Sequence, residues 1–193
     1  MKAVLISIQP KWCELIASGK KIVEVRKTKP KLEVPFKVYI YQTRRTWTYD
    51  IYSRIADWQG KVIGEFVCDR FITSFLNNND GWFVELGCLT TKEIDEYQGE
   101  NPTLYGWHIS DLIIYDKPKE LSLFHIVDYE AVRRCEYRER IYNNPDFTNN
   151  ALLPGGYVCN KGELDWCTKC KTKPLTHPPQ SYCYVEGLLL DGF

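Results

Sequence analysis

The pattern of apolar and polar residues near the start of the chain predicts a strand, a helix and a second strand in close succession. Ala3–Ile8 is a short apolar run, typical of a strand. Pro10 suits the first turn of a helix, and the apolar members of residues 12–16 recur at helical spacing. Gly19 follows as a left-handed helix cap, so the chain turns directly into a strand over residues 21–27.

The second strand separates charged from apolar side chains. Val23 and Val25 share one face, whereas Glu24 and Arg26 share the other. If the valines face a core, the charged pair points either to solvent or into a groove that grips a polar ligand. Spacing alone favours the solvated pair. Lys21, directly after the glycine turn, suits contact with a phosphate, or proton transfer if neighbouring cations lower its pKa.

Most of the remaining chain also reads as short strands separated by turns. Predicted strands cover residues 38–43, 61–69 with a possible bulge at Gly64, 104–115 with a break near Ser110 and Asp111, and 182–190. Other predicted features are a loop with a short helix at 44–58, a loop at 77–81, a helix at 91–97 capped by Thr90 or Thr91, a turn at 117–120 and a charged helix at 128–142. These elements predict an α+β, mainly β fold, built as a small β-barrel with short flanking helices.

Length and composition agree with one domain. The 193 residues, 44% of them hydrophobic, suit a single domain over residues 1–193 with an insertion at about 125–180, before the last strand. No segment is long and apolar enough to span a membrane, and the start is typical of a strand rather than a signal peptide. Cytoplasmic residence is therefore expected.

The charge is balanced overall but unevenly placed. Net charge is zero, which argues against indiscriminate nucleic-acid binding. Residues 1–54 nevertheless hold 12 Lys and Arg against 4 Asp and Glu, so the remainder carries the compensating negative charge. Either the basic part attracts phosphates, or the acidic part folds over it and cancels its field.

The insertion carries candidate metal ligands. Without an export signal, the eight cysteines are more typical of metal binding or buried thiols than of disulfides. Four of them suit a structural Zn²⁺ site, the last two as a C-x₂-C pair: Cys135, Cys159, Cys167 and Cys170. His177 and Cys183 are alternative ligands, and reduced thiols in a loop are the alternative to metal binding.

The run GKKIVEVR, residues 19–26, resembles the GxKxxExR signature of the ASCH domain without a gap. The flanking segments ISIQPKWCELIASGKK, EFVCDRF, YGWHISDLIIYDKPKEL and PPQSYCYVEG are similar too, so the resemblance covers roughly 1–124 and 178–188. ASCH domains are similar to PUA domains, small β-barrels that bind RNA. The resemblance implies that Gly19, Lys21, Glu24 and Arg26 form a cleft for RNA, a nucleotide or a modified base.

The resemblance also implies an alternative, a hydrolase acting on RNA or on a modified nucleoside, with Lys21 central. Some members deacetylate a modified cytidine with a lysine and a threonine three residues later, but Glu24 occupies the threonine position here. Other members are described as ribonucleases, and that chemistry needs a cation and proton-transfer groups. Ser110 is the second candidate catalytic residue, and His108 is a candidate ligand contact, although a lone histidine is more often structural.

Aromatic and basic residues are interleaved in the predicted loop at 44–58. Arg44, Arg45 and Trp47 suit stacking and phosphate contacts with single-stranded RNA, and ordinary loop packing is the alternative. Trp12 lies on the apolar face of the first predicted helix, so we expect it in the core.

Overall fold

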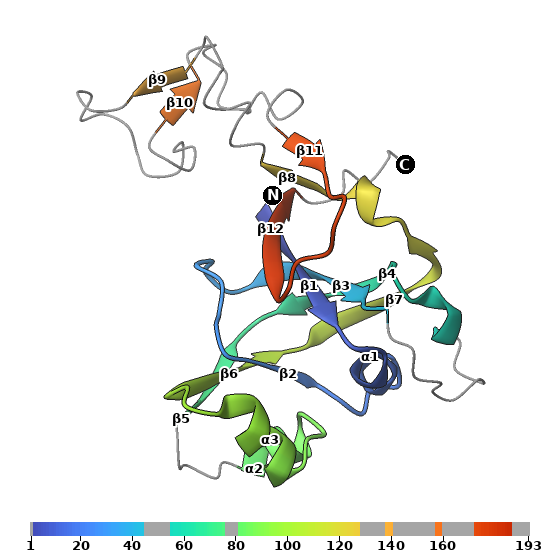
Figure 1. The fold of residues 1–193 in the computed structure, drawn as a ribbon, viewed down its shortest axis with the longest axis vertical. Coiled ribbons are helices and arrows are strands. Elements are labelled where there is room, and N and C mark those ends of the chain that lie inside the picture. Colours follow the sequence, from blue (N-terminus) through green and yellow to red (C-terminus); the bar gives the residue numbers. More distant parts are fainter. Residues whose placement is uncertain are drawn as a thin grey trace.

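The computed structural model describes residues 2–44, 55–75, 81–127, 138–140, 157–159 and 172–186. Two β-sheets form its centre (Figure 1). The larger sheet consists, in spatial order, of β12 (Tyr182–Glu186), β1 (Lys2–Ile8), β3 (Phe36–Gln42), β4 (Val62–Cys68) and β7 (Ser110–Lys119). The smaller sheet consists of β2 (Val23–Arg26), β6 (Thr103–His108) and β5 (Phe71–Phe75). Only β1 and β3 pair in parallel among these strands.

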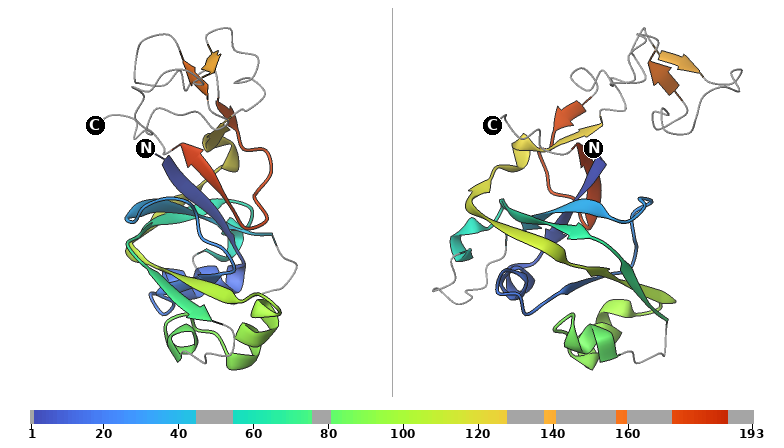
Figure 2. Two further views of the ribbon diagram at one scale, coloured as in Figure 1. Left: turned by 90° about the vertical axis from the view of Figure 1, so that its left-hand side faces the viewer. Right: turned by 180° about the vertical axis from the view of Figure 1, so that it is seen from behind.

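Short helices and two further strand pairs complete the described part of the chain. The helices are α1 (Pro10–Ala17), α2 (Gly81–Glu85) and α3 (Thr91–Gln98), with 3₁₀ turns η1 (Ala56–Trp58) and η2 (Leu121–Leu123). Two further strand pairs join β8 (His125–Val127) to β11 (Thr172–Pro174) and β9 (Arg138–Arg140) to β10 (Tyr157–Cys159). Figure 2 shows these pairs at the end of the molecule opposite α2 and α3.

The structure confirms a mainly β fold and corrects the prediction of a closed barrel. The described strands form separate sheets: β1 lies inside the larger one, between β12 and β3, whereas β2 is an edge strand of the smaller one. Among the described strands, no edge strand of one sheet pairs with an edge strand of the other. β6 runs into β7 after a break at Ile109, so one long segment passes from the smaller sheet to the larger. The two sheets are therefore not closed into a barrel.

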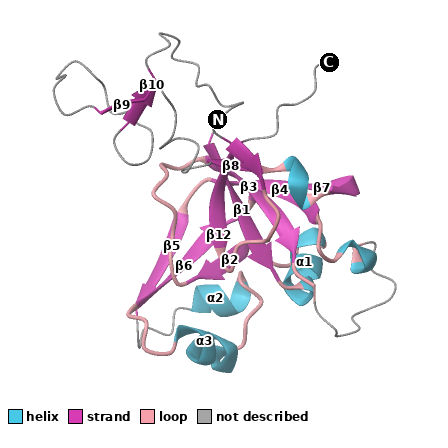
Figure 3. Cartoon of the chain, turned by 45° about the horizontal axis from the view of Figure 1, so that its top comes forward, coloured by secondary structure: helices cyan, strands magenta, loops and turns pink. Residues whose placement is uncertain are grey.

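Apolar side chains fill the spaces on both sides of the smaller sheet. The main core lies between the sheets and includes Ile6, Ile16, Ile40, Phe66 and Trp107, all buried. On the other side, Val23 and Val25 pack with Phe83 of α2 and Leu104 of β6. Figure 3 shows α2 and α3 beneath this sheet. Both faces of β2 are thus covered, which gives its charged residues an unusual environment.

The local predictions had mixed outcomes. The strand–helix–glycine–strand order, the α3 helix with its Thr90 cap and the strand break before Ser110 are confirmed. The Gly64 irregularity is confirmed too, because the β4–β7 register shifts beside it and a Cβ there would lie 2.4 Å from the Ile113 carbonyl oxygen. The turn at 117–120 is wrong, since β7 continues to Lys119 by pairing with Val62 of β4.

The predicted insertion lies mostly outside the described residues. The helix predicted over 128–142 is wrong at Arg138–Arg140, which pair as β9 with β10, and the rest of that range is not described. β8 and β11 pair side by side, which is compatible with an excursion that leaves and returns at one point. The boundaries at about 125–180 stay a prediction. No helix in the described ranges has the length and apolar character needed to cross a membrane.

Candidate functional site

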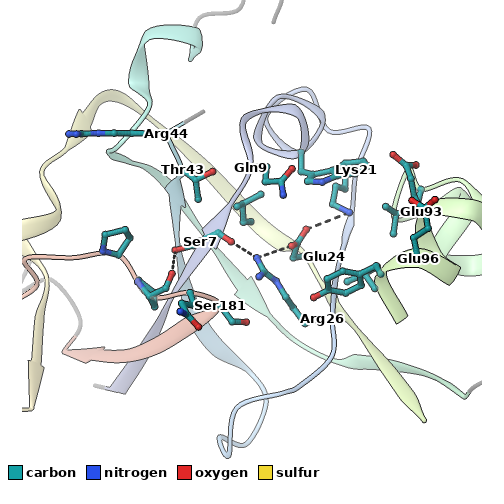
Figure 4. A pocket seen from close by; sticks show the side chains of 18 residues that line it. Ser7, Gln9, Lys21, Glu24, Arg26, Thr43, Arg44, Glu93, Glu96 and Ser181 are labelled. Atoms are coloured by element: carbon teal, nitrogen blue, oxygen red, sulfur yellow. Dashed lines mark hydrogen bonds and ion pairs between the residues drawn. The ribbon is translucent and has the colours of Figure 1, made fainter. Parts of the chain in front are cut away.

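A pocket of about 870 Å³ lies between the end of β1 and strand β2 (Figure 4). Its lining comes from the end of β1, helix α1, strand β2, the segment after β3, helix α3 and the segment before β12. The lining residues are Ser7, Ile8, Gln9, Trp12, Lys21, Glu24, Val25, Arg26, Thr43, Arg44, Leu89, Glu93, Glu96, Tyr97 and Pro178 to Ser181. Its volume falls within the range of small-molecule sites.

The turn after α1 places Lys21 at this pocket. Gly19 has a φ of +72°, a left-handed conformation that favours glycine. Through this turn, the backbone N–H groups of Lys20 and Lys21 both donate to the carbonyl of Leu15, at 2.9 Å. The helix end is thereby closed, and the chain enters β2 immediately afterwards.

The segment after α2 forms hydrogen bonds with the start of β2. The backbone N–H groups of Ile22 and Val23 donate to the Leu86 carbonyl, and the Lys21 ammonium donates to the Gly87 carbonyl at 2.7 Å. A Cβ on Gly87 would lie 2.5 Å from the Phe83 carbonyl oxygen, so only glycine fits without a shift. The acceptor for Lys21 therefore belongs to a tightly packed backbone.

Three buried charged side chains meet at the base of the pocket. Glu24 lies between two cations, with its Oε2 3.5 Å from Lys21 Nζ and its Oε1 3.0 Å from an Arg26 guanidinium nitrogen. All three residues are less than 9% exposed. Figure 4 shows them directed toward one another. Glu24 and Arg26 thus point into a groove, as one of the two alternatives from the sequence predicted. The other alternative, in which the residue spacing favoured a solvent-exposed pair, is wrong.

Arg26 links this charged cluster to the far wall. Its guanidinium also donates to the Ser7 carbonyl at 2.6 Å, and the Ser7 hydroxyl donates to the Pro179 carbonyl at 2.6 Å. The segment 178–181 is therefore joined to β2 through the end of β1. Residues more than 150 positions apart in the sequence form opposite sides of one pocket.

Two polar atoms in the lining have no partner among the described residues. The Arg26 Nε and the Thr43 hydroxyl are both buried without a hydrogen bond. Buried polar atoms are nearly always satisfied, because leaving one without a partner costs about 1–3 kcal/mol. A ligand with hydrogen-bonding groups suits this part of the pocket.

Burial changes the protonation behaviour of Lys21. Desolvation lowers the pKa of its ammonium, and the nearby Glu24 carboxylate opposes that shift. The ammonium also lies 5.0 Å from the centre of the Trp12 ring. Trp12 packs against the core as predicted, and it also lines the pocket. Lys21 is thus a cation held between a carboxylate, a carbonyl and an aromatic face.

Helix α3 supplies an acidic rim. Glu93, Glu96 and Tyr97 line the pocket from this side, and Glu93 forms a 2.8 Å ion pair with Lys11 of α1. The Glu93 carboxylate also accepts the Thr90 backbone N–H, while its own N–H donates to the Thr90 hydroxyl, which completes a capping box. Lys11 and this backbone contact lower the pKa of Glu93 to about 2.

Substituting Glu93 by alanine is expected to lower the unfolding free energy at pH 7 by about 1 kcal/mol, as for other lost caps. The pKa of Glu93 is lower in the folded protein than in the unfolded chain. The alanine variant should therefore show its full loss of unfolding free energy above pH 4.5, and this loss should disappear as pH falls through about 2. Urea midpoints of both proteins across this range measure it. Lys11→Met, which removes only the ion pair, should cost less. A difference independent of pH would contradict this role of the carboxylate.

The other predicted contact residues lie in different places. Arg44 lines the pocket at its edge, whereas Arg45 and Trp47 are outside the described residues. His108 and Ser110 are not in the lining. The His108 Nδ1 lies 2.6 Å from Asp69 Oδ1, and the Ser110 hydroxyl donates to the Val67 carbonyl. Gly19 shapes the turn but does not line the pocket. The roles assigned to these residues stay predictions.

The predicted zinc site cannot be placed. Cys135, Cys167 and Cys170 lie outside the described residues, and of Cys159 only the strand β10 is described. Within the described ranges, no group of three or more His, Cys, Asp or Glu side chains could hold a metal ion. Cys13, Cys68, Cys88 and Cys183 are free thiols.

Sequence reasoning missed much of the pocket wall. Ser7, Thr43 and Tyr97 come from the ends of predicted elements, and Pro178–Ser181 from a proline-rich segment far along the chain. The resemblance of PPQSYCYVEG to a segment that accompanies the ASCH signature is the signal that could have located Pro178–Ser181. Nothing local marks Ser7 or Thr43 as pocket residues.

Comparison with known proteins identifies the family. The ASCH domain family model matches residues 6–140. A crystal structure of the ASCH protein from Zymomonas mobilis is similar with a TM-score of 0.50 at 21% identity, covering 62% of this chain and 73% of that one. Two single-residue variants of that protein give TM-scores of 0.48 and 0.47, also at 21% identity, with coverages of 63% and 77%, and of 62% and 74%. Curated proteins gave no significant match. The chain belongs to the ASCH domain family.

Proposed function

We propose that the pocket binds RNA through one unpaired base, or a free nucleotide or modified base of the same chemistry. Membership in the ASCH family, whose fold is similar to that of RNA-binding PUA domains, supports this class of ligand. The observation that carries the proposal is the convergence of Lys21, Glu24 and Arg26 in one pocket, with the Arg26 Nε still without a partner among the described residues.

The chemistry of the pocket favours a planar ligand that both donates and accepts hydrogen bonds. Glu24 is a fixed acceptor, and Arg26 and the Thr43 hydroxyl supply donors. Trp12 and Tyr97 add aromatic surface, on which bases stack. The three cations of the lining are matched by three carboxylates. A base with a mixed polar edge suits such a balanced site better than an isolated polyanion.

A second function, hydrolysis of RNA or of a modified nucleoside, is favoured by one observation. Burial lowers the pKa of Lys21, and an amine with a lowered pKa is better suited to proton transfer at neutral pH. In this alternative Lys21 moves the proton and Arg26 stabilises developing negative charge. Ser110 lies outside the lining, so this alternative rests on Lys21.

The test is calorimetric titration with nucleosides, nucleoside monophosphates and an eight-nucleotide single-stranded RNA. Arg26→Lys keeps the charge but removes Nε and the forked geometry. We expect at least about tenfold weaker binding, equal to about 1.4 kcal/mol. Arg70→Lys changes an exposed arginine outside the lining and should bind as the wild type does. Absence of binding to every probe, or equal binding by Arg26→Lys, would contradict the proposal.

A further inference from the structure

A run of lysines leaves the pocket at the end of β2. Arg26 is followed by KTKPK, which places Lys27, Lys29 and Lys31 in the loop that leads to β3. Lys29 and Lys31 are exposed and Lys27 is half-buried. No carboxylate of the described residues forms an ion pair with any of the three. One acidic residue, Glu33, lies further along the same loop.

Two of these cations, Lys27 and Lys29, lie over aromatic rings. Lys27 Nζ lies 5.2 Å from the ring centre of Tyr97, which itself lines the pocket and is 39% exposed. Lys29 Nζ lies 5.3 Å from the ring centre of Phe71 and 5.5 Å from that of Tyr105. Cation–π contacts of this kind restrain long side chains without neutralising their charge.

The loop is also anchored on the wall side of the pocket. The backbone N–H of Lys31 donates to the Tyr184 hydroxyl at 2.8 Å, and Thr28 hydrogen-bonds the side chain of Tyr182. Both tyrosines belong to β12, directly after the wall segment that ends at Ser181. The loop that carries Lys27, Lys29 and Lys31 therefore contacts first α3, then β5 and β6, and finally β12.

We infer that Lys27, Lys29 and Lys31 form a phosphate-binding track, so that the ligand is a single-stranded RNA segment of several nucleotides rather than a free nucleotide. This inference rests on the proposed function. A base that enters the pocket is unpaired, so its strand continues outside as a single strand. Its phosphates then meet cations that have no carboxylate partner. Tyr97, exposed beneath Lys27, offers a face on which a neighbouring base stacks.

The electrostatic balance supports this division of roles. Charges in the pocket lining cancel, so they do not by themselves attract a polyanion. Adjacent to it, the loop adds three positive charges and one negative charge. Contacts to phosphates supply affinity without reading sequence, whereas contacts to a base provide selectivity. The track would therefore determine affinity for the strand and the pocket would select the base.

The experiment compares Lys27→Ala/Lys29→Ala/Lys31→Ala with a charge-matched control, Lys117→Ala/Lys119→Ala/Lys173→Ala. The control residues lie on β7 and β11, away from the loop between β2 and β3 (Figure 1). Fluorescence anisotropy with an eight-nucleotide labelled RNA is measured across salt concentrations. Nucleoside monophosphate binding is measured by calorimetry.

The loop variant should bind the RNA on the order of 100-fold more weakly at 0.1 M salt, and its plot of log affinity against log salt should be shallower by about 2. Its affinity for a monophosphate should change less than about fivefold, and the control should bind RNA as the wild type does. Equal RNA affinities and slopes for the two triple variants would overturn the track and leave the pocket proposal standing. No binding of RNA or monophosphate by the wild type would overturn both.

Discussion

Glu24→Gln should lower the free energy of unfolding by about 3–5 kcal/mol, the usual cost of removing one partner from a buried ion pair. Glutamine keeps the shape of the side chain but leaves Lys21 and Arg26 without their shared carboxylate, 3.5 and 3.0 Å away. Both cations are buried, so solvent screens their unpaired charge only weakly. Urea unfolding at pH 7 measures the effect.

The matched control is Glu120→Gln. Glu120 pairs with Lys61 at the surface, and its side chain is 62% exposed. Exposed pairs contribute about 0–1 kcal/mol, so this variant should unfold almost as the wild type does. If Glu24→Gln were no less stable than Glu120→Gln, the three buried charges would not depend on one another.

Lys21→Met should weaken nucleotide or RNA binding on the order of 100-fold, a typical cost of truncating a buried charged contact. Stability should change by less than about 1.5 kcal/mol, because methionine fills similar volume and Glu24 retains Arg26. Lys21 and Glu24 thus separate two roles of the cluster. Loss of Glu24 mainly affects folding, whereas loss of Lys21 mainly affects the ligand.

Alkaline pH provides an independent readout for Lys21. Burial lowers its folded pKa below the ordinary 10.5, so the unfolded chain binds the proton more tightly. The unfolding free energy of the wild type, relative to that of Lys21→Met, should therefore rise with pH between the folded pKa and about 10.5. This gain should be absent below the folded pKa.

Calorimetric titration at pH 7 measures the loss of binding in Lys21→Met, and chromatography of the RNA or nucleoside detects hydrolysis. Unchanged binding by Lys21→Met would contradict its place in the site, and product formed by the wild type alone would favour the hydrolase.

The elements around the signature could be predicted from the sequence because their signals are local. Proline at the start of α1, glycine after it and alternation in β2 each reflect backbone conformation over a few residues. The same alternation places Glu24 and Arg26 on one face. It does not reveal that this face is also buried. α2 and α3 cover the face with the valines, so the charged face is directed toward the space between the sheets.

The elements that could not be predicted from the sequence depend on the pairing of strands that are far apart along the chain. β5, with the sequence FITSF, exists because Phe71 to Phe75 pair with β6, and helix α2 is only five residues long and rich in residues that favour strands. Whether the sheets close into a barrel is decided by which edge strands pair, and the edge strands β12 and β2 do not pair with each other. The pocket wall at 178–181 likewise depends on the pairing of β12 with β1.

That pairing sets the order in which the pocket can be built during synthesis. Ribosomes add about 5–20 residues per second, so roughly 8–30 s pass between translation of Arg26 and of Ser181. Until β12 emerges and docks on β1, the Ser7 hydroxyl has no Pro179 carbonyl to bond and the cavity lacks one side. A nascent chain that ends before β12 therefore carries the complete signature but an unfinished cavity, and the ligand binding proposed above would require β12.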